Sequence, residues 1–189
     1  MELKDSLFNI LPPLSLSAFV SNMVFMTFLF YISAFVAVIA TILVITRTNA
    51  VHALLYLIVS LLAVALIFFT LGAPFVAALE VIIYAGAIIV LFVFVIMMLN
   101  LGTSAAKQES ALFAPGVWIG PAVLCFILAG ELVYYLTTET SRIPGLGTVS
   151  TKQVGIALFG PYAVGVELAS MLLLAGLVGA YHLGRREES

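Results

Sequence analysis

Three glutamates lie inside apolar segments of this sequence, and each is a candidate for proton chemistry. Glu80 lies in "ALEVIIYAGAIIVLF", Glu131 in "LAGELVYYL" and Glu167 in "VGVELASML". A charge at the centre of a membrane costs several kcal/mol, so ionisable residues there usually face protein or water and mark functional sites. We interpret Glu80 and Glu167 as candidate members of a proton path and Glu131 as a residue that can reach the interface; for Glu167, a structural hydrogen bond to a neighbouring helix or subunit is the alternative.

The three glutamates differ in their distance from the ends of the segments that carry them. Glu131 lies about five residues from the nearer end, roughly 7 Å along a helix, so its side chain can reach the interface. Glu80 lies about six residues into its segment, roughly 9 Å deep. Glu167 lies about twelve residues into its segment, roughly 18 Å deep, and is therefore the carboxylate predicted to need a partner most.

The segment around Glu80 has one small and polar face. Ala77, Glu80, Tyr84 and Ala87 follow at i, i+3, i+7 and i+10, which is one stripe of a helix. Gly86, a residue that weakens helices, follows Tyr84 by two positions. The glutamate and the tyrosine could exchange hydrogen bonds with water in a narrow gap. Alternatively, the stripe is a packed interface, because small residues let membrane helices approach closely.

The composition predicts an all-α integral membrane protein. The chain has 189 residues, of which 64% are hydrophobic and 8% are charged, whereas a soluble domain carries about 25% charge. A helix needs about 20 apolar residues to cross a bilayer, and five segments qualify: about 26–45, 51–71, 74–99, 117–136 and 155–183. The turns between the first three are short, so these helices should be adjacent and antiparallel. In the fifth segment, Pro161 should bend the helix or delay its start.

Charge and motifs bear on the orientation, the domain division and the possible ligands of the chain. Lysine and arginine in the loops favour an N-out, C-in orientation, chiefly because "GRREES" follows the last helix. Residues 1–25, broken by two prolines, are interpreted as an N-terminal extension of unknown role, and 26–189 as the five-helix transmembrane domain. A net charge of −2 argues against a nucleic-acid partner. One cysteine, two distant histidines and the lack of any nucleotide-binding motif predict no metal, NAD or flavin on this chain.

Three long strings carry a resemblance to a known family. They are "TRTNAVHALLYLIVSLL" (46–62), "LEVIIYAGAIIVLFVFVIMMLNL" (79–101) and "GIALFGPYAVGVELASMLLLAGLVGAYHLGR" (155–185). In this order they closely resemble the J subunit of bacterial NADH:quinone oxidoreductase, or respiratory complex I, whose mitochondrial counterpart is NADH dehydrogenase subunit 6. The resemblance covers about residues 26–186, and family members begin near Met26.

The resemblance implies a subunit of a proton-pumping complex that passes electrons from NADH to a quinone. FMN, iron–sulfur clusters and quinone are then expected in partner subunits, and no cofactor on this chain. The expected partners are the quinone-site subunit, the small K-type subunit and the antiporter-like subunits, together with lipid. The expected location is the bacterial inner (plasma) membrane, as a multi-pass protein.

The resemblance also implies a π-bulge in the third helix beside Tyr84 and Gly86. The helix is thought to switch between α and π forms and so to open or close a water path between the quinone end and the pumping channels. Extra turns of π-helix are rare and concentrate at functional sites. A proton-relay role for Glu80 and Glu167 is our own hypothesis. The alternatives are a passive scaffold subunit of the same complex, or a subunit of a related hydrogenase or cation-antiporter complex.

Overall fold

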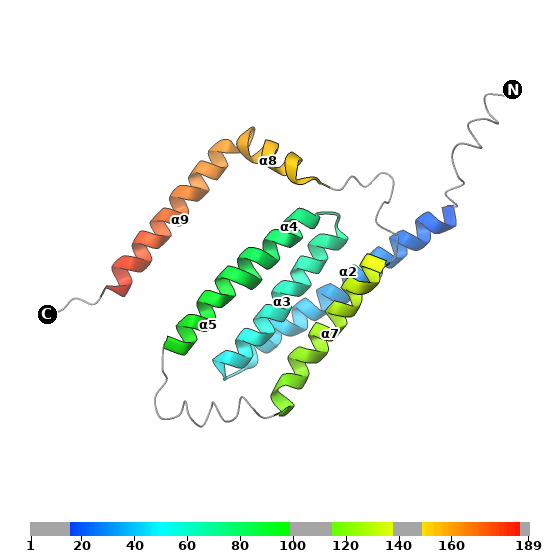
Figure 1. The fold of residues 1–189 in the computed structure, drawn as a ribbon, viewed down its shortest axis with the longest axis horizontal. Helices are drawn as coiled ribbons and strands as arrows, with labels where there is room; N and C mark the ends of the chain where they lie inside the picture. Colours follow the sequence, from blue (N-terminus) through cyan, green and yellow to red (C-terminus); the bar gives the residue numbers. More distant parts are fainter. Residues whose placement is uncertain (1–15, 99–114, 138–148, 186–189) are drawn as a thin grey trace. The chain divides into compact units, whose positions relative to one another are not determined.

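The chain folds into helices that form two compact units. A computed structural model describes residues 16–98, 115–137 and 149–185, and it divides the chain into residues 1–148 and 149–189 (Figure 1). Five helices in the described part are long and apolar enough to cross a membrane: Met23–Thr46, Ala50–Thr70, Pro74–Met98, Trp118–Thr137 and Ala163–Gly184. The prediction of an all-α, multi-pass membrane protein with five spans is therefore confirmed.

The first unit contains four of these spans, built around α3. Its elements are α2 (Leu16–Thr46), α3 (Ala50–Thr70), α4 (Pro74–Leu79), the π-helix η1 (Glu80–Ile88), α5 (Ile89–Met98) and α7 (Pro115–Thr137). Helix α3 contacts α2, the continuous α4–η1–α5 span and α7. Figure 1 shows α2 and α3 running side by side. The helix at the centre of the unit is thus the one with a three-residue turn at each end.

The two short turns of this unit have specific end signals. Asn49 caps α3, where its side-chain oxygen accepts hydrogen bonds from the backbone N–H groups of Val51 (2.9 Å) and His52 (3.3 Å). Between α3 and α4, Gly72 has a φ of 79°, a left-handed conformation that glycine adopts without strain. Pro74 follows in the first turn of α4, where its missing N–H costs nothing. These turns make α2, α3 and the third span antiparallel neighbours, as the sequence predicts.

Small residues form the core between α2, α3 and α7. Ala40 and Ala63 are completely buried, and Leu128 of α7 closes the same cluster. Small side chains let membrane helices approach closely. The hydroxyl groups of Thr41 and Ser60 lie 2.9 Å apart and link α2 to α3 inside this contact.

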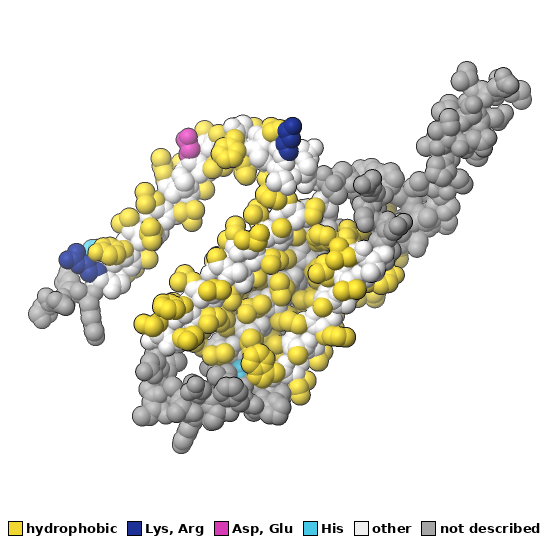
Figure 2. Space-filling model, viewed as in Figure 1, with side chains coloured by type: hydrophobic (Ala, Val, Ile, Leu, Met, Phe, Trp, Pro, Cys, Tyr) yellow, Lys and Arg dark blue, Asp and Glu magenta, His cyan; other side chains and the backbone are white. Residues whose placement is uncertain are grey.

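The spans differ widely in how much of their surface the chain itself covers. About 33% of the residues in the second span are buried within the chain, against 6% in the third and 0% in the fifth. Figure 2 shows apolar side chains over the visible face of both units. The third and fifth spans are therefore little covered by the other helices of their own units.

The second unit consists of two helices joined by a short turn. It contains α8 (Thr151–Phe159) and α9 (Ala163–Gly184). A capping box starts α8: Ser150 Oγ accepts from the N–H of Gln153 at 3.3 Å, and the Gln153 side chain accepts from the N–H of Ser150 at 2.9 Å.

The expected single helix over about 155–183 is two helices. A Cβ at Gly160 would lie 2.7 Å from the carbonyl oxygen of Ile156, so this position accepts only glycine without a backbone shift. Pro161 then lacks the N–H that would continue the helix, and α9 begins at Ala163. Glu167 is therefore the fifth residue of α9, about 6 Å from its start, rather than roughly 18 Å deep.

The other boundaries differ from expectation by smaller amounts. The first helix begins at Leu16 rather than Met26, because no proline or glycine interrupts residues 16–25. The third span ends at Met98, and α7 covers Pro115–Thr137 where 117–136 was expected. Residues 1–15, most of the expected N-terminal extension of unknown role, lie outside the described residues.

Candidate functional site

The third span contains a π-helix at the predicted candidate residues. η1 runs from Glu80 to Ile88, nine residues between α4 and α5. The N–H of Ile89 donates to the carbonyl of Tyr84, five residues earlier, which is the π pattern. Glu80, Tyr84 and Gly86, predicted from the sequence as proton-path or gating residues, are therefore part of one π-helical segment.

The π-helix sets which residues on either side of it face the unit. Ala77 in α4 and Ile89 in α5 are both buried. They are twelve residues apart, which in an α-helix is about 3.3 turns, so the two would point about 120° apart. A π-helix has more residues per turn, and with η1 between them the twelve residues make about three turns. Both side chains therefore face the same side of the span.

Gly86 relieves crowding inside this wider helix. A Cβ at Gly86 would lie 3.2 Å from the carbonyl oxygen of Val81, five residues earlier. This is tighter than an ordinary van der Waals contact, so a larger residue would require a small backbone shift. Tyr84 is 49% exposed, and no residue of η1 is buried within the chain. The segment packs against α3, but none of its side chains is fully buried by its own chain.

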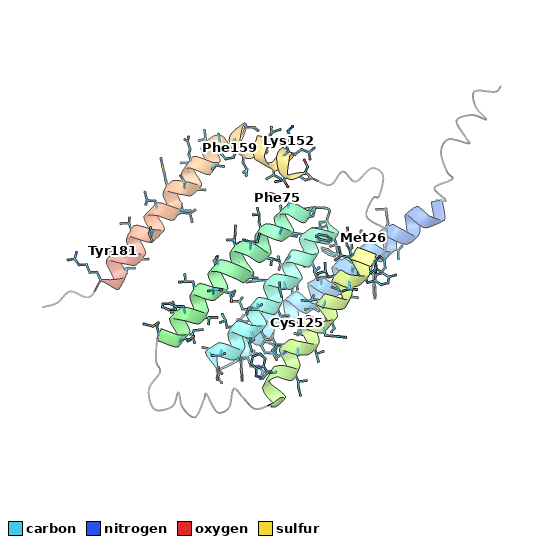
Figure 3. All side chains as sticks on the ribbon, in the orientation of Figure 1. Met26, Phe75, Cys125, Lys152, Phe159 and Tyr181 are labelled. Carbon is cyan, nitrogen blue, oxygen red and sulfur yellow. The ribbon has the colours of Figure 1, made fainter. Side chains whose placement is uncertain are left out.

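An apolar groove of about 380 Å³ lies beside the start of η1. It runs between α3, the α4–η1 junction and α7, and small side chains such as Ala65, Ala77 and Ala129 line it together with Cys125. Figure 3 shows Cys125 on α7 and Phe75 at the start of α4. The groove supplies no charged group for a ligand. It does leave space into which the start of η1 can move.

Glu131, expected to reach the interface, instead forms a hydrogen bond between two helices of the first unit. Ser33 Oγ on α2 donates a 2.8 Å hydrogen bond to Glu131 Oε2 on α7, and Ser33 is only 1% exposed. The other carboxyl oxygen of Glu131, Oε1, is buried without a hydrogen-bond partner in the described structure. The side chain therefore turns into the unit instead of reaching the interface, and no local sequence pattern joins two residues 98 positions apart.

Glu80 and Glu131 lie at the same level of the first unit. Each is six residues, or about 9 Å, from the end of its span. The groove brings these ends together, because Pro74–Val81 and Cys125–Leu132 supply its two sides. Glu167 belongs to the other unit, where it is exposed on α9 and its backbone carbonyl accepts from Ser170 Oγ at 2.7 Å. No group of three or more metal-binding side chains occurs in the described residues.

Comparison with known proteins identifies the family. The sequence matches the NADH-ubiquinone/plastoquinone oxidoreductase chain 6 family over residues 40–183. The chain belongs to this family. It is 59% identical to NADH-quinone oxidoreductase subunit J of Pseudomonas aeruginosa over 164 residues, covering 86% of this chain and 98% of that protein. The subunit J of Escherichia coli K12 is also 59% identical, over 87% of this chain and 89% of its own length.

A more distant J subunit, from Buchnera aphidicola of Schizaphis graminum, is 51% identical over 86% of this chain and all of its own. The family match includes all of η1, Glu131 and Glu167, whereas Ser33 lies before it. The J-subunit resemblance predicted from three sequence strings is thus confirmed.

Proposed function

We propose that this J subunit couples quinone reduction to proton translocation in a proton-pumping NADH:quinone oxidoreductase through a rearrangement of its third span. In this proposal η1 changes between π and α forms. Family membership supports the complex, and the π-helix at Tyr84 and Gly86 is the observation that carries the mechanism.

The shared face of the buried residues on either side of η1 supports a rotation of α5 as the proposed motion. Conversion of η1 to α-helix would turn α5 by about a third of a turn relative to α4, because Ala77 and Ile89 would no longer share a face. The side chains that α5 presents to a neighbour would then change. The lack of fully buried residues in η1 and the groove beside its start favour such a motion.

Glu80 is the proposed proton-relay group nearest to this motion. It is the first residue of η1 and precedes Tyr84 by four positions, so the carboxylate and phenol lie on neighbouring parts of the same segment. A change in helix form would move the two relative to each other and to any water beside them. Glu167 is proposed as a second relay or hydrogen-bonding group, on the surface that α9 leaves uncovered.

The setting of the subunit follows from the family. We propose the inner membrane of a bacterium, the N-out, C-in orientation, and contacts with the quinone-site, small K-type and antiporter-like subunits. FMN, iron–sulfur clusters and quinone are proposed to lie in partner subunits. A passive scaffold is the competing function, and the uncovered apolar surfaces of the third and fifth spans favour it equally, because a scaffold also needs contact surface.

A matched pair of glycine variants separates gating from scaffolding. Gly86→Val should crowd the π form against the Val81 carbonyl, whereas Gly130→Val, also within a span, places its side chain in open space. We expect both complexes to assemble, and only Gly86→Val to lower the number of protons pumped per NADH oxidised. Glu80→Gln and Glu167→Gln should lower the same ratio.

The readouts are the amount of assembled complex, NADH oxidation by the quinone, and proton uptake or release measured in vesicles. Normal proton stoichiometry in all assembled variants would refute gating. Loss of assembly in Gly86→Val, with normal stoichiometry in the fraction that assembles, would establish a scaffold role instead.

A further inference from the structure

Glu131 is half-buried between α2 and α7, where its carboxyl group has few hydrogen-bond donors among the described residues. Its Oε2 accepts from Ser33, and its Oε1 is buried without a partner in the described structure. A small cavity adjoins the pair between α2, α3 and α7, and its polar members are Ser33, Thr70, Glu131 and Tyr135. The space open to the centre of a water molecule is about 10 Å³, so it has room for about one water.

We propose that Glu131 is a neutral carboxylic acid that holds an exchangeable proton, shared with Ser33, inside the membrane unit. The assignment concerns a residue for which the gating proposal has no use. It stands whether or not η1 changes form.

The hydrogen-bond inventory of the site argues for the neutral state. An ionised carboxylate has about four acceptor positions, and Ser33 is its only hydrogen-bond donor among the described residues. A carboxylate with one oxygen orphaned in an apolar environment is strongly destabilised, and such a group takes up a proton instead. A neutral acid leaves only its carbonyl oxygen without a hydrogen bond, and this costs less free energy than leaving an oxygen of an ionised carboxylate without one.

The geometry of the Ser33–Glu131 pair suits both protonation states. The 2.8 Å distance between Ser33 Oγ and Glu131 Oε2 is typical of an O–H···O hydrogen bond. When Glu131 is ionised, Ser33 donates to it. When Glu131 is neutral, the acid proton on Oε2 can be donated to Ser33 Oγ, because a hydroxyl both donates and accepts. The pair can therefore gain or lose a proton without moving α2 or α7.

The depth of the Glu131 proton relates it to the π-helix. Glu131 lies at the level of Glu80, about 9 Å from the same end of the first unit. The α4–η1 junction and α7 face each other across the groove at this level. The unit thus has two carboxyl groups at one depth, one on the π-helix and one on the packed side of α7.

Infrared spectroscopy of the purified whole complex tests this assignment. Spectra are recorded after equilibration in H₂O and in D₂O, and their difference shows the C=O stretch of exchangeable carboxylic acids. Wild type should contain a C=O band that Glu131→Gln lacks. Ser33→Ala should keep that band but shift it to higher frequency, because the hydrogen bond to the carboxyl group is lost. Ser60→Ala, which removes a buried serine hydroxyl bonded to Thr41 instead, is the matched control and should leave the band in place.

Each outcome decides the proposal. Identical C=O regions for wild type and Glu131→Gln would show that Glu131 carries no exchangeable proton and would overturn it. If Glu131→Gln does not assemble, the comparison rests on Ser33→Ala against Ser60→Ala: a shift only in Ser33→Ala supports the assignment, and no shift overturns it. Because proton pumping is not the readout, failure of this proposal leaves the gating proposal intact, and the reverse also holds.

Discussion

The contact between Gly120 and Tyr56 allows a quantitative prediction about how α7 packs on α3. Tyr56 is a buried residue of α3, and the Arg47 guanidinium lies 5.5 Å from the centre of its ring. A Cβ at Gly120 of α7 would overlap the phenol oxygen of Tyr56. Gly120→Ala should therefore force either the ring or α7 to move.

The stability that Gly120→Ala should lose, and that Tyr56→Phe should restore, follows from the atoms that surround the new methyl group. Extra methyl groups in a packed core typically cost about 1–3 kcal/mol. If Tyr56→Phe removes the hydroxyl, the nearest ring atom is Cζ at 3.2 Å from the new Cβ, followed by Cε1 at 3.6 Å. A shift of a few tenths of an ångström relieves that contact. The double variant should therefore recover most of the stability that Gly120→Ala loses.

The assay is thermal inactivation of quinone-linked NADH oxidation in membranes that contain the assembled complex. Gly120→Ala should lower both the amount of complex and its inactivation temperature, and the addition of Tyr56→Phe should raise both. Gly130→Ala is the matched control, because no atom lies within 4 Å of its new Cβ. The reasoning is refuted if Gly120→Ala behaves like Gly130→Ala, or if the double variant is no better than the single.

Three further substitutions have defined expectations. Asn49→Ala removes the cap of α3 and should cost about 1 kcal/mol, seen as a lower inactivation temperature that Asn49→Asp restores. Gly160→Ala places a methyl group 2.7 Å from the Ile156 carbonyl, so spin labels on α8 and α9 should report a changed distance, and an unchanged distance would contradict the packing argument. Ser60→Ala breaks the contact with Thr41 and should cost about 1 kcal/mol, seen as a lower inactivation temperature; Thr41 keeps its hydrogen bond to the Ala37 carbonyl, so a much larger loss would contradict this reasoning.

The spans could be predicted because the bilayer imposes a length on any apolar helix. All five expected segments contain a spanning helix in the structure, and the short turns correctly indicated antiparallel neighbours. Pro161 was expected to bend the fifth helix or delay its start, and α9 does begin at Ala163, but the depth of Glu167 was counted from residue 155. The apolar letters continue through the break at Gly160, and the contact with the Ile156 carbonyl depends on backbone geometry that hydropathy does not record. Counted from Ala163, Glu167 is about 6 Å from the start of its helix.

Part of the candidate site could likewise be predicted from the sequence, and part could not. Tyr84 and Gly86 were found through a local string, and the structure has its π-helix there. The Glu131–Ser33 pair could not be found, because it depends on how α7 lies against α2. Depth along a single helix cannot tell whether a side chain turns toward lipid or toward a neighbouring helix.

The proposed rearrangement requires the π and α forms of the third span to be close in stability, and the energetics of the span are consistent with this. The π form keeps Ala77 and Ile89 on one face, whereas the α form would turn one of them outward. In water that exposure would cost about 1.5–3 kcal/mol for an isoleucine. In a membrane the outward side chain meets lipid, which is as apolar as the site it leaves, so most of this cost disappears. The remaining free-energy cost of each form is small. The π form has a wider, less regular helix, and the α form loses a few packing contacts. A segment with no buried residue of its own, and with glycine at its tightest carbonyl contact, is where such a balance can be shifted by a neighbour.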